Sequence, residues 1–332
     1  MTINRHQEIG LTNEQVLEMY ETMLLARKLD ERMWLLNRSG KIPFVISCQG
    51  QEAAQVGAAF ALNRKEDYVA PYYRDMGVVL AFGMTVKDLM LSAFAKADDP
   101  NSGGRQMPGH FGQKKNRILS GSSPVTTQVP HAVGVALAAK MEKKDFVTFV
   151  TLGEGSSNQG DFHEGLNFAG VHKLPVITMV ENNKYAISVP YERQVASKNV
   201  ADRALGYGMP GVTVDGNDPL AVYQAVKEAR DRAIRGDGPS LIESVSYRLT
   251  AHSSDDDDRT YREKDEVEEA KKKDSIFTFA TYLKENQILT EAVEQNLNET
   301  ITKLVNEATD FAENAAYAKP EDTLKYVYEE TK

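Results

Sequence analysis

The sequence predicts an α/β fold with a central, mostly parallel sheet flanked by helices. Short apolar and β-branched segments alternate with helical patterns, turn residues follow the apolar segments, and no internal repeat or low-complexity linker breaks the alternation. A strand followed by a helix and a second strand forms a parallel crossover, which is right-handed in nearly all cases. Continuous apolar strands of this kind are typical of sheets that are covered on both faces.

The first long element is an amphipathic helix over about residues 12–38. Its apolar residues recur at helical spacing, the opposite face is charged, and Thr12 precedes the pattern as a cap. We expect this helix to lie on the core, and we assign residues 1–40 to an N-terminal helical arm.

One strand–helix–strand unit stands out in the middle of the chain. Residues 146–152 (FVTFVTL) indicate a strand buried on both faces, and residues 175–180 indicate a second. A helix over about residues 161–172 joins them, with Asp161 as its predicted N-cap.

The remaining segments extend the same pattern. Residues 128–141 are rich in Ala and Val nearly all round, which predicts a helix buried against the sheet. Residues 219–235 indicate an amphipathic helix and residues 240–247 a strand. We assign residues 41–262 to one α/β domain, and the charged, mostly helical residues 263–332 to a C-terminal region packed on that domain.

Composition narrows the class of protein. The chain has 332 residues and a formal net charge of −9, which argues against a nucleic-acid surface because such binding relies on Lys and Arg. No apolar run of membrane-spanning length and no signal-peptide core occur, so we expect a cytoplasmic protein without membrane contact. The single cysteine, Cys48, excludes an internal disulfide and indicates a small buried apolar side chain.

Polar side chains follow the two strands of the central unit. Gly-Glu-Gly (residues 153–155) ends the first, and Glu181, Asn182 and Asn183 end the second. Parallel strands place their carboxyl ends at one edge of a sheet, where such folds bind ligands. Glu154 offers a carboxylate and Asn183 an amide oxygen, a combination suited to Mg²⁺ shared with phosphate oxygens. A tight turn and an ordinary loop are the alternative interpretation.

Two further clusters carry groups that suit an anion. Tyr73 and Arg74 follow an expected strand end at residues 68–70, and Arg74 can bind phosphate bidentately. Residues 121–128 are rich in hydroxyl groups and precede the buried helix, whose positive end favours an anion. An exposed arginine beside core tyrosines and a Ser-Pro turn are the respective alternatives.

His252 precedes four consecutive aspartates, Asp255 to Asp258. In isolation this run predicts a flexible, solvated loop, because adjacent carboxylates repel one another. We expect the neighbouring carboxylates to favour the charged form of His252. A histidine in a loop is often without a catalytic role, so its position relative to the diphosphate site decides its interpretation.

These motifs resemble the α subunit of the 2-oxoacid dehydrogenase decarboxylating components, which bind thiamine diphosphate. The Gly-Glu-Gly and Asn-Asn pair resembles the thiamine diphosphate signature, with Glu154 in place of the usual Asp. The resemblance covers almost the whole chain and implies a thiamine diphosphate-binding fold. Within the family, Arg-Gln-Met-Pro (105–108) and Ser-Ser-Pro-Val (122–125) resemble the branched-chain 2-oxoacid enzyme more than the pyruvate enzyme.

The resemblance also implies roles for individual residues. The Mg²⁺ ligands are matched by Glu154, Asn183 and the carbonyl of Tyr185. The groups around thiamine diphosphate are matched by Tyr73, Arg74, Ser123, Val125, Gly155, Ser156, Asn183 and His252. A potassium site is matched by Ser122, Pro124, Thr127 and Gln128. Glu181 departs from the mammalian-type enzyme, which has an arginine there, and Ser253 matches a position phosphorylated in mitochondrial relatives.

The resemblance implies oxidative decarboxylation of branched-chain 2-oxoacids and acyl transfer to lipoyl groups, with His252 as the catalytic residue of this chain. It further implies a β subunit in an α2β2 heterotetramer, docked on a lipoyl-bearing dihydrolipoyl acyltransferase core. A pyruvate or acetoin dehydrogenase α subunit is the alternative within the family. A non-catalytic scaffold subunit and a NAD-dependent dehydrogenase are alternatives outside it, although residues 153–160 lack the Gly-X-Gly-X-X-Gly spacing.

Overall fold

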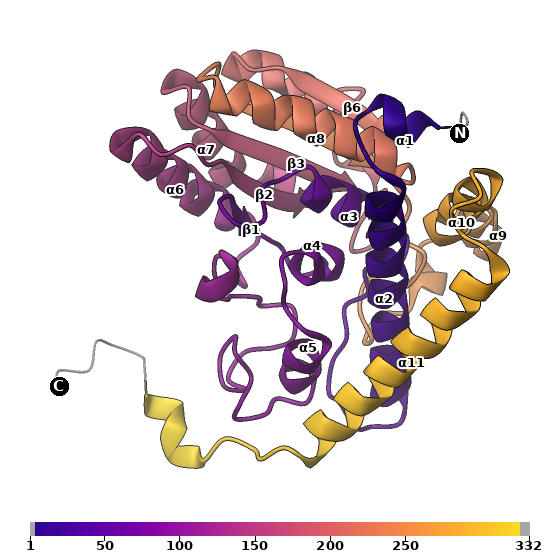
Figure 1. The fold of residues 1–332 in the computed structure, drawn as a ribbon. Helices are drawn as coiled ribbons and strands as arrows, with labels where there is room; N and C mark the ends of the chain where they lie inside the picture. The colour runs from indigo at the N-terminus through magenta and orange to yellow at the C-terminus, as the bar shows by residue number, and fades with distance from the viewer. Residues whose placement is uncertain (1–3, 326–332) are drawn as a thin grey trace.

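A computed structural model describes residues 4–325, and a five-stranded parallel sheet in the order β1-β2-β3-β7-β6 lies at its centre (Figure 1). The predicted α/β fold is confirmed. A short antiparallel ribbon, β4 with β5, follows β3 along the chain. The strands are β1 (Tyr68–Ala70), β2 (Thr148–Gly153), β3 (Val176–Asn182), β4 (Tyr185–Ala186), β5 (Val189–Pro190), β6 (Gly211–Asp215) and β7 (Ser240–Val245).

Each face of the sheet packs against its own helices because successive strand residues point to opposite sides. Phe149 and Ile177 join one apolar core with helices α3 and α8. Val150 and Val176 join a second core with α6 and α7 on the other face. Figure 1 shows α8 and α6 on opposite sides of the strands. These helices are α3 (Glu52–Phe60), α6 (Gln128–Glu142), α7 (Gly160–Val171) and α8 (Pro219–Ile234).

The predicted N-terminal helix is α2 (Asn13–Arg38), and Thr12 caps it as expected. The Thr12 hydroxyl accepts the N–H of Gln15 while the Gln15 side chain accepts the N–H of Thr12, which is a capping box. The buried face of α2 packs against α3, α4, α10 and α11. The other helices before β2 are α1 (Arg5–Glu8), α4 (Met76–Ala81) and α5 (Val86–Ala93).

The C-terminal helices are α9 (Lys264–Lys271), α10 (Ser275–Glu285) and α11 (Glu291–Asn314). Helices α10 and α11 pack on α2 and contribute Phe279 and Ile301 to the same core as α3 and α8. None of the helices between residues 4 and 325 has the length and apolar character needed to span a membrane. The division into arm, domain and C-terminal region stays a prediction, and its outermost residues, 1–3 and 326–332, lie outside the described residues.

One predicted detail of the helices is wrong. Helix α7 begins at Gly160 after Gln159, so Asp161 lies in the first turn and does not cap it; its carboxylate still complements the positive helix end. Helix α6 packs against the sheet as predicted, but its other face is exposed: the Met141 side chain is 74% exposed, and a Cβ on Gly134 would meet nothing within 4 Å. The outer face of α6 is open because no other element of the described chain covers it.

Candidate functional site

The predicted polar clusters lie together at the carboxyl edge of the sheet. Gly153, the last residue of β2, pairs with Glu181 near the end of β3. Tyr73 and Arg74 follow β1, and His252 follows β7. Strand register therefore brings residues from four segments to one place, as expected for parallel strands.

Glu154 and Asn183 are hydrogen-bonded neighbours and both are buried. The Glu154 carboxylate accepts the backbone N–H of Asn183 at 3.2 Å and the side-chain amide of Gln194 at 3.3 Å. Burial raises the pKa of Glu154, and these hydrogen bonds act in the opposite direction. A buried carboxylate held by neutral donors is a favourable ligand for a cation, which would remove the cost of its charge.

The loop after β3 has an unusual backbone. Lys184 (φ 77°) and Ile187 (φ 55°) both adopt the left-handed region, which costs energy for residues with a Cβ and is frequent at functional sites. The Asn183 side-chain oxygen accepts the N–H of Tyr185 at 3.2 Å. The carbonyl of Tyr185 accepts Nη1 of Arg248 at 3.3 Å. The amide oxygen is therefore held by the backbone of the same loop, and the carbonyl oxygen by Arg248.

Gly155 is required where β4 approaches the glycine turn. A Cβ at Gly155 would lie 2.5 Å from Cβ of Ala186, whereas a Cβ at Gly153 would meet nothing closer than 3.9 Å. Only the second glycine of the motif is therefore fixed by packing. The following residue, Ser156, accepts the Thr126 hydroxyl through its carbonyl at 3.0 Å, which ties the turn to the segment before α6.

Arg74 is buried, contrary to the alternative of an exposed side chain. Its Nη1 donates to the carbonyl of Ser47 at 2.8 Å, and its Nη2 donates to the carbonyl of His252 at 3.0 Å. Among residues 4–325, buried Nε of Arg74 has no hydrogen-bond partner, and neither has the side-chain amide nitrogen of Gln51. Buried donors without partners are costly, so the site is suited to an additional acceptor such as a phosphate oxygen.

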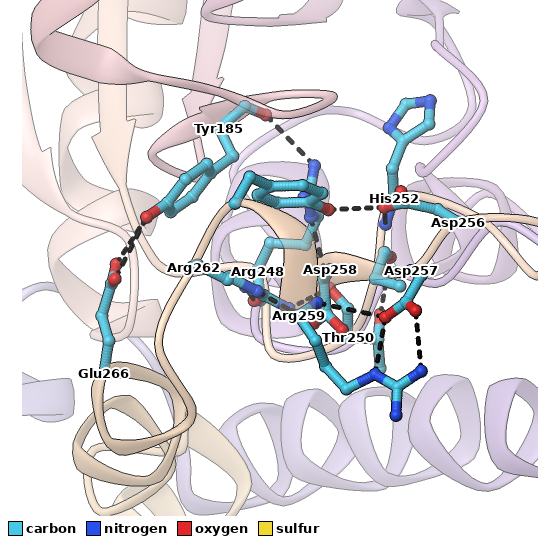
Figure 2. Close-up of polar contacts among 12 residues, drawn as sticks. Tyr185, Arg248, Thr250, His252, Asp256, Asp257, Asp258, Arg259, Arg262 and Glu266 are labelled. Carbon is cyan, nitrogen blue, oxygen red and sulfur yellow. Dashed lines mark hydrogen bonds and ion pairs between the residues drawn. The ribbon is translucent and has the colours of Figure 1, made fainter.

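His252 is neutral, and the expectation that carboxylates favour its charged form is wrong. Burial and the nearby guanidinium groups of Arg74 and Arg248 lower its pKa to about 4, and Asp256 only partly opposes them. Nη2 of Arg74 lies 2.9 Å from Nδ1 of His252. An arginine can only donate, so Nδ1 accepts and neutral His252 carries its proton on Nε2. Figure 2 shows the imidazole directed away from the carboxylates of Asp257 and Asp258.

The aspartates after His252 are held by hydrogen bonds and ion pairs (Figure 2). Asp256 accepts the backbone N–H of His252 at 2.7 Å, Asp257 pairs with Arg259, and Asp258 pairs with the buried Arg262 at 2.6 Å. The run is therefore not an isolated set of repelling carboxylates, because arginines that follow it in sequence neutralise two of them. Its mobility without cofactor stays a prediction.

Arg248 links this loop to the turn after β3. Its Nη2 donates to the carbonyl of Ile187 at 2.8 Å and to the hydroxyl of Tyr261 at 2.8 Å, while Nη1 reaches Tyr185. The Tyr261 hydroxyl in turn donates to Asp256. One buried guanidinium thus connects the predicted metal-ligating loop to the His252 loop.

Glu181 is buried beside a second carboxyl group, that of Asp75. It accepts Gln55 at 3.0 Å and the Tyr72 hydroxyl at 3.2 Å, and it adjoins Asp75. Burial raises the pKa of Asp75 well above its usual range, and the adjacent Glu181 raises it further. Two such carboxyl groups cannot both ionise, so the pair shares a proton. Glu181 interacts with protein groups here, where the mammalian-type enzyme has an arginine.

A cavity of about 180 Å³ opens beside these groups. Its lining combines predicted site residues, namely Tyr73, Ser122, Ser123, Val125, Gln128 and Ser156, with the apolar side chains of Phe44, Ile46 and Met107. The ring of Tyr73 also meets the ring of His252 edge-on, with centroids 6.2 Å apart. Tyr73 therefore contacts His252 and also lines the cavity.

The predicted potassium residues are only partly brought together. Ser122 and Gln128 line the cavity, and Gln128 donates to the carbonyl of Thr151 at 2.9 Å. Pro124 is exposed and Thr127 directly precedes α6. This site stays a prediction.

Sequence reasoning missed Gln51, Gln194 and Arg248. Gln51 accepts the side-chain amide of Asn183 at 3.2 Å and the Tyr72 hydroxyl at 3.1 Å, and the other two residues hold Glu154 and Tyr185. Gln51 and Gln194 belong to no recognisable motif, and Arg248 lies in the cluster around His252 without a role of its own in the sequence prediction. Amide and guanidinium groups acquire such roles only through long-range packing. A group of three or more His, Cys, Asp or Glu side chains suited to a metal is not found among residues 4–325. The oxygen set of one carboxylate, one amide and one carbonyl suits a hard cation such as Mg²⁺.

Comparison with known proteins identifies the family. The model of the family described as "Dehydrogenase E1 component" matches residues 20–321. The chain belongs to the dehydrogenase E1 component family. A 2-oxoisovalerate dehydrogenase subunit alpha of Bacillus subtilis (strain 168) is 75% identical over 328 residues, which cover 99% of each chain.

Two further relatives share less of their sequence with this chain. A pyruvate dehydrogenase E1 component subunit alpha of Staphylococcus aureus (strain Mu50 / ATCC 700699) is 39% identical, over 99% of this chain and 86% of the relative. A 3-methyl-2-oxobutanoate dehydrogenase subunit alpha of Mycobacterium tuberculosis (strain CDC 1551 / Oshkosh) is 37% identical, over 99% and 87%. Membership of the E1 family makes a Rossmann-type nicotinamide dehydrogenase untenable as an interpretation.

Proposed function

We propose that this chain is the α subunit of a branched-chain 2-oxoacid dehydrogenase decarboxylating component. The observation that carries the proposal is the 75% identity, over the full length of both chains, to a 2-oxoisovalerate dehydrogenase subunit alpha, against 39% to a pyruvate enzyme. Cavity-lining Phe44, Ile46 and Val125 suit the branched apolar side chain of such a substrate. A pyruvate or acetoin dehydrogenase α subunit is the alternative.

The proposed cofactor is thiamine diphosphate with Mg²⁺. Glu154, Asn183 and the Tyr185 carbonyl would hold the metal. Tyr73, Arg74, Ser123, Val125, Gly155, Ser156 and His252 would surround the cofactor. Nε of Arg74, which has no hydrogen-bond partner among the described residues, supports this assignment because it could donate to a phosphate oxygen. Bound thiamine diphosphate would supply the nucleophilic carbon and electron sink for decarboxylation.

His252 is the proposed catalytic residue of this chain. Its neutral imidazole has Nδ1 engaged by Arg74, so Nε2–H is the group that can donate to a substrate or to an incoming lipoyl group. Arg74 fixes this tautomer and orients the ring. In the proposed reaction, His252 therefore orients its partner and donates a hydrogen bond at a defined position.

The proposal includes a β subunit in an α2β2 assembly. Exposed apolar side chains on α7 and on the 3₁₀ helix that packs against it (Val200–Tyr207) support it: Phe168 is 42% exposed, Val171 69% and Leu205 89%. The β subunit would complete the cofactor site and carry the glutamate that activates the pyrimidine ring. Docking on a lipoyl acyltransferase core, a potassium ion at residues 122–128 and a cytoplasmic location belong to the same proposal.

A substrate panel tests this function. The chain is co-expressed with its β subunit, and turnover of 3-methyl-2-oxobutanoate, pyruvate and acetoin is measured with Mg²⁺ and thiamine diphosphate. The proposal expects the highest kcat/KM for the branched 2-oxoacid. Preference for pyruvate or acetoin would replace it with the alternative, and a lack of turnover of all three compounds would overturn it.

A further inference from the structure

His110 connects two segments of the cavity wall, residues 107–110 and residues 122–125. Its Nδ1 lies 2.8 Å from the carbonyl of Met107, and its Nε2 lies 2.5 Å from the hydroxyl of Ser123. A carbonyl can only accept, so Nδ1 carries a proton. In the neutral ring Nε2 is then an acceptor, and the hydroxyl of Ser123 donates to it. Both His110 and Ser123 line the cavity.

The segment that contains Ser123 has little other support. Gly121 donates its N–H to the carbonyl of Phe111 at 2.6 Å, and the Thr126 hydroxyl donates to Ser156. Residues 122–125 lie between these two contacts. Within the described part of the chain, the bond from Ser123 to His110 is the one hydrogen bond that holds them. Thr126 has φ of 80°, a strained conformation for a β-branched residue. Because residues 122–125 are largely exposed and the adjoining Thr126 is strained, we expect a contact from another part of the chain to hold them in one position.

The His110 side of this contact is firmly placed. Gly109 adopts φ of 90°, and a Cβ there would lie 3.0 Å from the carbonyl oxygen of Tyr73. Residues 107–110 therefore pack directly against Tyr73, whose ring meets His252. The contact chain runs from Tyr73 through Gly109 and His110 to Ser123.

We propose that His110 is a positioning residue for the 2-oxoacid reaction. It accepts the Ser123 hydroxyl and thereby holds residues 122–125 as the cavity wall opposite Tyr73. Substrate and cofactor then meet a cavity wall whose position is fixed. The hydroxyl proton of Ser123 points to His110 and not into the cavity. This inference rests on the proposed function.

Kinetics of the assembled enzyme test the coupling. With the β subunit, Mg²⁺ and thiamine diphosphate, His110→Ala is expected to lower kcat/KM for 3-methyl-2-oxobutanoate about 5-fold or more, the size of one lost hydrogen bond, mainly through a higher KM. His110→Gln keeps an acceptor near the Nε2 position and is expected to recover most of the loss. Lys115→Gln, an exposed side chain on the same connecting segment, is the matched control and should leave both constants unchanged.

A double-mutant cycle separates positioning from general damage. If His110 acts through Ser123, the double variant His110→Ala with Ser123→Ala is no worse than the poorer single variant. Losses that multiply in the double variant, or a His110→Ala enzyme with unchanged KM, would overturn the proposal. Inactivity of the unmodified enzyme on every 2-oxoacid would instead count against the proposed function.

A spectroscopic readout does not depend on activity. The full-length α chain with ¹⁵N-labelled histidine is examined by NMR, and the His110 signals are identified by their loss in His110→Gln. The structure requires the Nδ1–H tautomer, with the Nε2 resonance moving in Ser123→Ala while Nδ1 stays protonated. An Nε2–H tautomer, or a spectrum insensitive to Ser123→Ala, would contradict the geometry.

Discussion

Arg74 and His252 form a directed pair in which the guanidinium Nη2 lies 2.9 Å from the imidazole Nδ1. The same nitrogen donates to the His252 carbonyl, and Nη1 donates to Ser47, so the guanidinium is fixed at both ends. This pair connects the loop after β1 to the loop after β7. It determines both the tautomer and the charge of the histidine that we assign to catalysis.

Replacing Arg74 by Gln should raise the pKa of His252. Burial is the main cause of the low pKa of His252, and it persists in this variant. The next largest cause, the positive charge of Arg74, is removed. NMR titration of the C2 proton in the α chain measures the change. Arg203→Gln is the control and should leave the His252 pKa unchanged, because Arg203 donates to the carbonyl of Ser157 and is not one of the charges that act on His252. A titration curve of Arg74→Gln that superimposes on that of the unmodified chain would contradict the pairing.

Stability should depend on His252 in the mildly acidic range. Its folded pKa of about 4 lies below the ordinary value of 6.5, so between these values the unfolded chain binds more protons than the folded chain. This contribution is complete above about pH 6.5 and is lost as the pH falls toward 4. Urea unfolding should show a steeper loss of stability over this range for the unmodified chain than for His252→Gln. Parallel curves would count against a neutral buried imidazole.

The glycine turn offers a matched pair of substitutions. Gly155→Ala should destabilise the fold by about 1–3 kcal/mol and weaken cofactor binding, because its Cβ overlaps with Ala186. Gly153→Ala, with nothing closer than 3.9 Å, should be tolerated. Thermal unfolding and thiamine diphosphate titration of the assembled enzyme measure both effects. Equal behaviour of the two variants would show that the approach of β4 does not constrain the turn.

Asn183→Ala should weaken Mg²⁺-dependent thiamine diphosphate binding about 10- to 100-fold, the range for a lost hydrogen bond or ligand contact to a charged group. The amide oxygen would be missing from the metal, and Gln51 and the Tyr185 N–H would lose their partner. Calorimetric titration with and without Mg²⁺ measures the change. Unaltered Mg²⁺ dependence would remove Asn183 from the proposed ligand set.

The pair of Asp75 and Glu181 predicts a pH dependence of the opposite sign. Burial raises the pKa of Asp75 in the folded state, so folding binds a proton, and stability is lost as the pH rises through the folded value. In Asp75→Asn an amide can donate to Glu181 without titrating. Urea unfolding should therefore show that Asp75→Asn gains stability relative to the unmodified chain as the pH is raised. A difference that is constant with pH would contradict the shared proton.

Local patterns were sufficient to predict the sheet and the location of the site. The strand–helix–strand unit and the capped helix at Thr12 depend on residues close in sequence, and parallel strands bring Glu154 and Asn183 together as a consequence. The environment of His252 was not predictable in this way. Its charge depends on Arg74, which is distant in sequence, while the adjacent aspartates pair with other groups.

The same limit applies to α6 and Arg248. The Ala- and Val-rich composition of residues 128–141 predicts burial against the sheet, but it does not reveal that the opposite face of α6 is exposed. Arg248 lies in the cluster around His252, but its contacts to Tyr185, Ile187 and Tyr261 arise only in the folded chain. For residues such as Arg74 and His252, the pattern of the sequence allowed more than one interpretation, and the resemblance to a family indicated their roles.

The most direct test of the central claim is the rate of carbon dioxide release from 3-methyl-2-oxobutanoate by the α chain assembled with its β subunit. We predict release that requires both subunits, Mg²⁺ and thiamine diphosphate, and that is abolished in Glu154→Ala. Release that is indifferent to Mg²⁺ and thiamine diphosphate, or that persists undiminished in Glu154→Ala, would contradict the account.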